Sequence, residues 1–221
     1  MPNKIYAWSY SRWADHDKCP ALAKFKHVDR IREPENDAMR NGQLAHDSLA
    51  KFIGDRSGDV QLPKVGERFA ALLLQLRELE PLHDEEWGFT NQWRPTGWFS
   101  RDCWFRSKLD AAVVYDDNTA DVVDFKTGKD SPTHAQQAEL YAISIFVRYS
   151  NVSHVIARFW YLDTGDESVF RFARSDLESL IKKWEAKVRP MLNDTIFAPK
   201  PGKHCKYCFY AKSNNGPCKF G

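Results

Sequence analysis

Two aspartates and a lysine form a set of side chains that could carry out metal-ion chemistry. Asp110 precedes two alanines, and fourteen residues later Asp124, Phe125 and Lys126 follow two valines. Because side chains alternate along a strand, Asp124 and Lys126 would point to one face and Phe125 to the other. Two carboxylates that hold a divalent cation, with an ammonium group beside them, are a minimal set for cleaving a phosphodiester bond.

The segments that carry these residues read as the two strands of a hairpin. Residues 102–115 and 120–127 are rich in β-branched and aromatic side chains, and the turn signal at 116–118 separates them. In a hairpin centred on residue 117, Asp110 and Asp124 would be near cross-strand neighbours on one face. Their mutual repulsion would be relieved by a divalent cation. The alternative is two solvated aspartates on the surface.

A histidine on a preceding helix completes the candidate ligand set. Residues 37–54 read as a helix in which His46 lies one turn after Gly42 and one turn before the apolar Leu49 and Ile53. A glycine inside a helix costs about 1 kcal/mol relative to alanine, so another backbone segment or a ligand is expected to approach Gly42. Oxygen ligands with one imidazole suit Mg²⁺ or Mn²⁺. The alternative is a histidine buried in the core.

The remaining periodicities predict an α/β fold. A second helix is expected at about 65–80 and another at 133–149, and a last helix would run from a Ser175 cap to about Leu192. Further strands are expected at the following positions: 85–94, 153–162 and 167–173.

An ordered set of short motifs resembles a known enzyme superfamily. Along the chain, at the expected order and spacing, come Gly42-x3-His46, Lys108-Leu109-Asp110, Asp124-Phe125-Lys126-Thr127-Gly128 and Gln137-x3-Tyr141. They resemble the PD-(D/E)XK nucleases, in particular the RecB-like exonuclease branch that includes the CRISPR-associated exonuclease. The resemblance spans about Ser9 to Cys218. The proline of the superfamily name is absent.

The resemblance implies both a fold and a set of functional residues. The fold would be a central mixed β-sheet flanked by helices, the restriction-endonuclease-like core. Mg²⁺ or Mn²⁺ would be bound by His46, Asp110, Asp124 and the backbone carbonyl of Phe125. The catalytic residues would be Lys126, Asp110 and Asp124. The substrate-binding residues would be Gln137 and Tyr141. Glu86, on the preceding strand, would lie nearby.

Four cysteines form a second candidate metal site. They lie at the two ends of the chain, at Cys19, Cys205, Cys208 and Cys218. Four thiolates are the usual ligands of a tetrahedral zinc ion or of a cubane iron–sulfur cluster. The resemblance implies a structural four-iron, four-sulfur (4Fe-4S) cluster, with zinc as the alternative, although the nine-residue gap before Cys218 is longer than expected. His204 could replace one ligand, and Cys103 is expected in the core.

The length and composition favour a single nuclease domain over residues 1–221. Its core would span about 37–192, and residues 1–36 and 193–221 would form the cysteine region, with the tail pinned to the N-terminal segment. No apolar run approaches the roughly 20 residues of a membrane span, and the chain does not begin like a signal peptide. A cytoplasmic location, in a bacterium or a phage-infected cell, is therefore expected, with free or metal-bound cysteines.

Charge is unevenly distributed along the chain. Residues 1–32 carry +4 and residues 182–221 carry +7, so that the 149 residues between them carry −9. Basic ends suit a polyanionic partner, and aromatic residues near these ends could stack on bases: Trp8, Trp13, Tyr207 and Tyr210. The alternative is an unevenly charged, solvated surface.

These observations predict a metal-dependent DNA nuclease, an exonuclease acting on single strands or duplex ends. It would serve DNA recombination or repair, phage replication or CRISPR adaptation. The alternatives are a catalytically inactive nucleic-acid-binding module, a sequence-specific endonuclease and a nuclease acting on RNA. No ATP-binding Gly-x4-Gly-Lys-Ser/Thr motif is present, so unwinding would require a helicase partner; a recombinase is another candidate partner.

Overall fold

The computed structural model describes residues 4–221, and these fall into two compact units. The sheet unit consists of residues 35–181. The terminal unit combines the residues up to Pro34 with Lys182–Gly221. The boundary before Lys182 assigns most of the last long helix to the terminal unit, whereas the sequence placed it in the core. That the whole chain acts as one nuclease domain stays a prediction.

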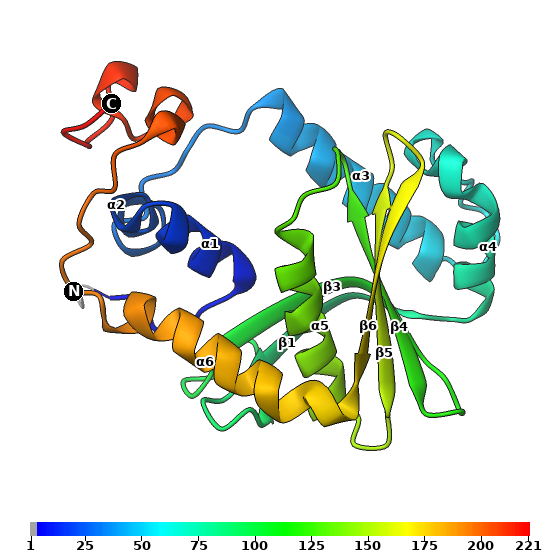
Figure 1. The fold of residues 1–221 in the computed structure, drawn as a ribbon. Coiled ribbons are helices and arrows are strands. Elements are labelled where there is room, and N and C mark those ends of the chain that lie inside the picture. Colours follow the sequence, from blue (N-terminus) through cyan, green and yellow to red (C-terminus); the bar gives the residue numbers. More distant parts are fainter. Residues whose placement is uncertain (1–3) are drawn as a thin grey trace. The chain divides into compact units, whose positions relative to one another are not determined.

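A six-stranded mixed sheet forms the centre of the sheet unit, in the order β2-β1-β3-β4-β5-β6 (Figure 1). Only β4 and β5 pair in parallel, while each of the other neighbouring pairs is antiparallel. The strands are β1 (Leu82–Phe89), β2 (Pro95–Thr96), β3 (Phe105–Val114), β4 (Thr119–Lys126), β5 (His154–Tyr161) and β6 (Asp166–Ala173). The predicted α/β fold with a mixed sheet is confirmed.

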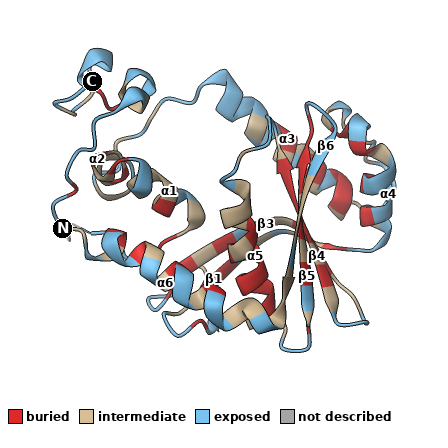
Figure 2. Ribbon diagram, in the orientation of Figure 1, coloured by how far each residue is buried: buried red, intermediate tan, exposed pale blue. Residues whose placement is uncertain are grey.

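Helices cover both faces of this sheet. The helix α3 (Asp37–Gly54) begins after Asn36, whose side chain accepts a hydrogen bond from the Met39 N–H. A 3₁₀ turn (Lys64–Phe69) leads into α4 (Ala70–Glu78), and α5 (His134–Arg148) connects the parallel strands β4 and β5. In Figure 2 the inner side of α5 and the strands beneath it are buried.

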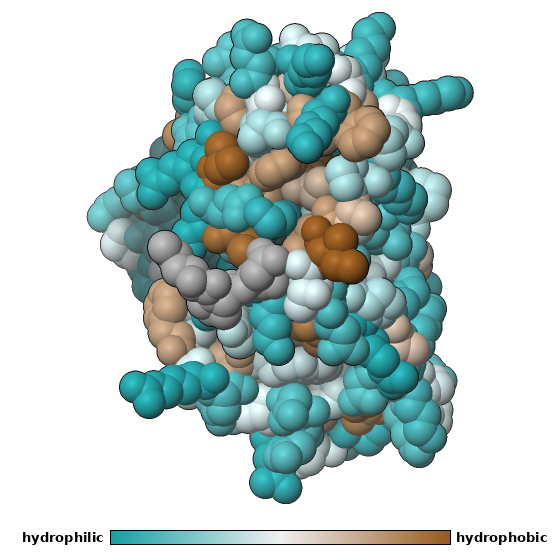
Figure 3. Space-filling view, turned by 90° about the vertical axis from the view of Figure 1, so that its left-hand side faces the viewer, coloured by the Kyte–Doolittle hydropathy of each residue, from teal (hydrophilic) through white to brown (hydrophobic). Residues whose placement is uncertain are grey.

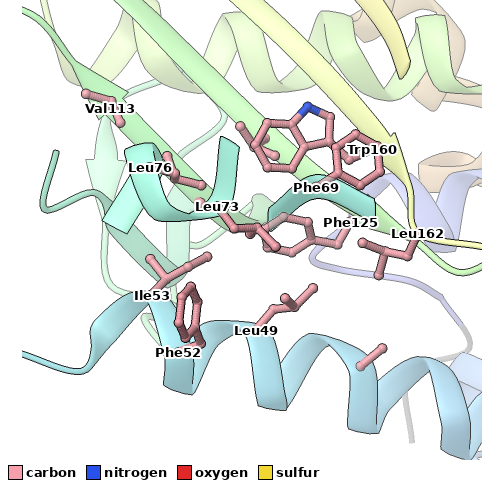
Figure 4. Close-up of a cluster of buried hydrophobic side chains, with 13 residues drawn as sticks. Leu49, Phe52, Ile53, Phe69, Leu73, Leu76, Val113, Phe125, Trp160 and Leu162 are labelled. Atoms are coloured by element: carbon pink, nitrogen blue, oxygen red, sulfur yellow. The ribbon is translucent and has the colours of Figure 1, made fainter. Parts of the chain in front are cut away.

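A cluster of apolar side chains fixes α3 and α4 to the sheet (Figure 4). Leu49, Phe52 and Ile53 of α3 meet Leu73 of α4 over Phe125 of β4. The rings of Phe69 and Trp160 stack in the same cluster, with centroids 5.0 Å apart. Because Phe125 points into this cluster, Asp124 on the same strand points to the opposite face, which α5 covers. The alternation expected from the sequence is therefore present.

Several predicted boundaries shift by a few residues, for local reasons. The strand expected at 85–94 ends at Phe89, because Thr90 turns the chain by accepting the backbone N–H groups of Gln92 and Arg94. Ser175 does not cap the last helix, α6 (Leu177–Asn193). It lies within a 3₁₀ turn in which the Asp176 carboxylate accepts the Ala173 N–H.

The terminal unit has a core of tryptophan rings. It contains α1 (Tyr10–Lys18), α2 (Pro20–Ala23), a π-helical turn (Lys24–Val28), the part of α6 from Lys182 onward and two short 3₁₀ turns. Trp184 of α6 stacks on Trp8 at 5.8 Å and meets Trp13 edge-on at 5.0 Å.

The burial of these rings bears on the predicted base stacking. Trp8, Trp13 and Tyr210 are buried, so the prediction that they stack on bases is wrong. Of the four aromatic residues predicted to stack, only Tyr207 is exposed, at 81%.

The surface in Figure 3 is mostly hydrophilic, with isolated hydrophobic side chains. Within residues 4–221, no helix has the length and hydrophobicity needed to cross a lipid bilayer.

The apolar cluster of Figure 4 gives a test of the fold. Leu49 is fully buried, so replacing it with alanine removes apolar contacts and leaves a cavity, which should lower the free energy of unfolding by about 2–5 kcal/mol. Leu74, on the exposed side of α4, is the matched control, and Leu74→Ala should change stability by less than about 0.5 kcal/mol. Urea unfolding followed by circular dichroism measures both, and equal effects would contradict the assigned packing.

Candidate active site

The site lies where the strand β3 loses its backbone pairing on both sides. The β3–β4 ladder runs from Val114↔Ala120 to Ala111↔Val123 and stops there, with Asp110 next in line on β3. Beyond this point the Phe125 N–H donates to the Asp110 carboxylate, with 2.8 Å between nitrogen and Oδ2. On the other side of β3, the pairing with β1 is interrupted at one position, where Asp84 lies opposite Asp110. The backbone of Asp84 is left-handed there, with a φ of 51°.

Asp124 is the buried carboxylate of the site. The residue is 3% exposed, and its Oδ1 accepts hydrogen bonds from the Tyr141 hydroxyl and, at 3.2 Å, from Gln137 Nε2. Its other oxygen, Oδ2, is also buried and lies 2.6 Å from Lys126 Nζ in an ion pair without hydrogen-bond geometry. Burial raises the pKa of Asp124, and the Asp110 charge adds to this rise while the Lys126 charge opposes it.

Lys126 is held in place by contacts on several sides. Besides its ion pair with Asp124, its ammonium donates to Gln137 Oε1 at 3.2 Å and lies 5.5 Å from the centre of the Phe159 ring. Gln137 also donates to the Tyr141 hydroxyl at 2.6 Å. The side chains of α5 therefore position both the lysine and the buried carboxylate.

His46 reaches the site from α3. Its Nδ1 lies 3.0 Å from Asp110 Oδ1, and this interaction raises the pKa of His46 above its ordinary value of 6.5. Gly42, one turn earlier, permits a close approach, because a Cβ atom there would lie 3.3 Å from Thr127 Oγ1. The neighbour of Gly42 is thus the Thr127 side chain, rather than the backbone segment or ligand expected from the sequence.

These residues line one pocket of about 270 Å³. The pocket brings together seven residues predicted from the sequence: His46, Asp110, Asp124, Phe125, Lys126, Gln137 and Tyr141. Their assigned roles stay predictions, including that of the Phe125 carbonyl.

The structure adds pocket residues for which no role was predicted from the sequence. Gln43, Asp47, Asp84 and Lys108 also line the pocket, and Lys108 Nζ lies 2.8 Å from Asp84 Oδ1. Glu86, expected nearby, is exposed and pairs across the strands with Lys108. The consecutive acidic residues 84–86 were a sequence signal for an acidic group near the site. Strand alternation alone does not show which of the three faces the site.

The chemistry of the pocket fits a divalent cation, although the side chains do not form a ready coordination shell. In the part of the chain that the structure describes, no group of three or more His, Cys, Asp or Glu side chains is arranged to hold a metal ion. The donor set nevertheless consists of two carboxylates and an imidazole nitrogen, which Mg²⁺ and Mn²⁺ accept. The buried Oδ2 of Asp124, which makes only an ion pair, is the oxygen best placed to gain from a cation.

The four cysteines gather in the terminal unit. Cys19, Cys205, Cys208 and Cys218 line one small pocket together with His204. Burial raises the pKa of the Cys208 thiol, and the neighbouring thiols of the other three cysteines add to the rise. The Lys200 N–H approaches Cys19 Sγ and the Gly202 N–H approaches Cys205 Sγ, each at 3.4 Å.

Two carboxylates and a lysine brought into one pocket by the neighbouring strands β3 and β4 suit metal-assisted cleavage of a phosphodiester bond. The chain belongs to the PD-(D/E)XK nuclease superfamily, whose family model matches residues 7–213. Members of this superfamily are phosphodiester hydrolases and usually use divalent metal ions. No curated protein matches the chain with statistical significance.

Two solved structures are similar to the chain. One is a candidate exonuclease from Eubacterium rectale, with a TM-score of 0.55 and 10% identity, covering 92% of this chain and 87% of that one. The other is SSO0001, with a TM-score of 0.45 and 13% identity, covering 99% of this chain and 89% of that one. At this identity the first similarity supports the fold alone.

The His46–Asp110 contact predicts a titration that can be measured without activity. A raised pKa means that the ion pair is fully formed below pH 6.5 and is lost as the pH rises through the raised value. Asp110→Asn should therefore lower the pKa of His46, measured by NMR of its ring protons in the presence of EDTA. Asp47→Asn, in the same pocket, is the control and should leave that pKa in place. An unchanged titration in Asp110→Asn would rule out the contact.

Proposed function

We propose that this nuclease is a divalent-metal-dependent deoxyribonuclease of the RecB-like branch, an exonuclease acting on single strands or duplex ends. The observation that carries the proposal is the meeting of Asp110, Asp124 and Lys126 in one pocket, with His46 on Asp110. These residues come from three elements, α3, β3 and β4, so their meeting depends on the packing of the sheet unit.

The proposed ligands of Mg²⁺ or Mn²⁺ are His46, Asp110, Asp124 and the carbonyl of Phe125. When bound, such an ion polarises a phosphoryl oxygen and lowers the pKa of a coordinated water. Lys126 supplies a positive charge that stabilises the negative charge developing on the phosphate. Tyr141 and Gln137 hold the Asp124 carboxylate in position through hydrogen bonds, and Gln137 also holds the Lys126 ammonium. Both residues line the pocket, where substrate would bind.

The intact residue set favours a nuclease over an inactive binding module. A module that only bound nucleic acid would have no use for a buried, unfavourably placed carboxylate such as Asp124, whose burial costs free energy. The choice of DNA and of exonuclease action rests on the branch resemblance and on the basic chain ends, which carry +4 and +7.

Lys126 gives the sharpest test of the mechanism. Lys126→Ala should retain DNA binding and reduce cleavage by at least about 10²-fold, the usual effect of removing one transition-state donor. Lys51→Ala, which removes an exposed lysine from α3, is the matched control and should cleave normally. Single-turnover cleavage of labelled DNA in Mn²⁺ measures both rates. Near-normal cleavage by Lys126→Ala would remove this lysine from the mechanism.

The same assay distinguishes the remaining activities. Single-stranded DNA, duplex DNA and RNA, each labelled at one end and then at the other, are digested in Mn²⁺. Stepwise loss of nucleotides from one end supports the exonuclease and gives its polarity. Discrete internal products would identify an endonuclease, and preferential loss of RNA would identify a ribonuclease. Dependence on an added helicase or recombinase would place the enzyme in a recombination, phage replication or CRISPR adaptation pathway.

The cysteine pocket supports a structural 4Fe-4S cluster that pins the tail to the N-terminal segment. The sulfurs of Cys19 and Cys205 are approached by backbone N–H groups, the arrangement that stabilises a thiolate ligand. Cys103 behaves differently, because its thiol donates to the Phe105 carbonyl at 3.6 Å in the manner of an ordinary core cysteine. His204, with a buried Nε2 that has no hydrogen-bond partner among residues 4–221, is the alternative fourth ligand.

Metal analysis decides between iron and zinc. Protein purified without oxygen should be brown and contain about four iron atoms per chain. Cys208→Ala should lose the iron and destabilise the terminal unit, whereas Cys103→Ala should keep the iron. About one zinc per chain and no iron would show that the cluster assignment is wrong, and unchanged thermal unfolding of Cys208→Ala would exclude a structural role.

A further inference from the structure

The loop between β2 and β3 presents an aromatic side chain to solvent. Phe99 is 86% exposed, and Trp98 beside it is half-buried. The guanidinium of Arg106 lies 5.2 Å from the centre of the Trp98 ring and 5.8 Å from that of Phe99. A phenylalanine left in water forgoes the stabilisation that its burial would contribute, so its position calls for a physical reason.

This loop is held in a defined shape. The backbone turns through hydrogen bonds from Ser100 to Gly97 and from Cys103 to Ser100, and Arg106 Nε donates to the Trp98 carbonyl at 3.0 Å. Thr96 donates to the Asp102 carboxylate at 2.8 Å. Phe99 is therefore carried on an ordered support, which lowers the entropy cost of placing a partner on it.

The loop is also positively charged within an acidic segment of the chain. Residues 90–108 carry Arg94, Arg101, Arg106 and Lys108 against the single acidic residue Asp102, a net charge of +3. The segment 33–181 that contains them carries −9. Arg94 and Arg101 are exposed, whereas the Asp102 carboxylate is already engaged by its own loop. This charge favours a polyanion over an acidic or neutral protein surface.

The charged face of β3 connects this loop to the catalytic pocket. Arg106 and Lys108 are two residues apart on a regularly paired stretch of β3, so they share one face, and Lys108 lines the catalytic pocket. From Phe105 to Asp110 the strand rises about 17 Å. That length corresponds to about five nucleotides at the spacing of a duplex strand, and to fewer in an extended single strand.

We propose that Trp98, Phe99, Arg101 and Arg106 form a stacking platform for single-stranded nucleic acid a few nucleotides from the scissile phosphate. A base stacks on the exposed Phe99 ring, and the arginines contact the flanking phosphates. Lys108, which pairs with Asp84, lies further along β3 at the pocket. This assignment rests on the proposed nuclease function and specifies its substrate as a strand whose bases are unpaired at the platform.

Binding in EDTA tests the platform separately from cleavage. The affinity of the full chain for a fluorescent 20-nucleotide oligothymidine is measured by anisotropy over a range of salt concentrations. Phe99→Ala and Phe99→Leu should each weaken binding at least about fivefold, the effect of losing one stacked base, and Phe99→Trp should bind like the wild type. Arg101→Ala should reduce the slope of log affinity against log salt by about 0.7. Leu74→Ala, an exposed apolar residue on α4, is the control.

Four outcomes separate this inference from the proposed function. Loss of affinity confined to the Phe99 and Arg101 variants supports the platform. Equal binding by wild type and Phe99→Ala, with normal cleavage in Mn²⁺, overturns the platform and leaves the nuclease intact. A wild-type protein that neither binds nor cleaves nucleic acid overturns both. A wild-type dimer in sedimentation that Phe99→Ala dissociates would make the loop an interface between copies and overturn the platform.

Discussion

The catalytic pocket depends on the hydrogen bond from the Phe125 N–H to the Asp110 carboxylate. At this point β3 and β4 stop exchanging backbone hydrogen bonds, and a side chain takes the place of a ladder acceptor. A buried backbone N–H left without an acceptor would cost free energy comparable to a lost hydrogen bond. The carboxylate removes that cost. The break in the β3–β4 pairing that it stabilises is where the pocket forms, lined by Asp84, Asp110 and Asp124.

A second constraint is the burial of Asp124. Its burial raises its pKa, and the opposing influences are the Lys126 charge and the Tyr141 hydroxyl. A buried charge whose partner is removed is strongly destabilising, so Lys126 stabilises the resting site as well as serving the proposed reaction. The same contacts explain why Gln137 and Tyr141 lie four residues apart on α5. Residues at this spacing share one face of a helix, and that face contacts both Asp124 and Lys126.

The sequence predicted those features that local periodicity and spacing determine. The hairpin centred on residue 117 and the helix 37–54 follow from a turn signal and from an apolar stripe, and both are present with little change. The left-handed backbone of Asp84 and its ion pair with Lys108 depend on tertiary packing and have no local signal. The role proposed for Trp8 and Trp13 failed because aromatic residues near basic charges also build cores, and here Trp184 stacks on Trp8 and meets Trp13 edge-on.

The electrostatics of the sheet unit bear on how a polyanion reaches the pocket. A segment with a net charge of −9 attracts divalent cations but repels nucleic acid, and a whole-chain charge of +2 provides little long-range steering. Within the sheet unit, favourable contacts with phosphate must then come from cations close to the pocket. Lys126 is engaged by Asp124 and Gln137, and Lys108 by Asp84, so neither is free of an acidic or amide partner. The arginines of residues 90–106 supply the missing charge locally, and the aromatic residues of the same stretch favour a strand with unpaired bases over a closed duplex.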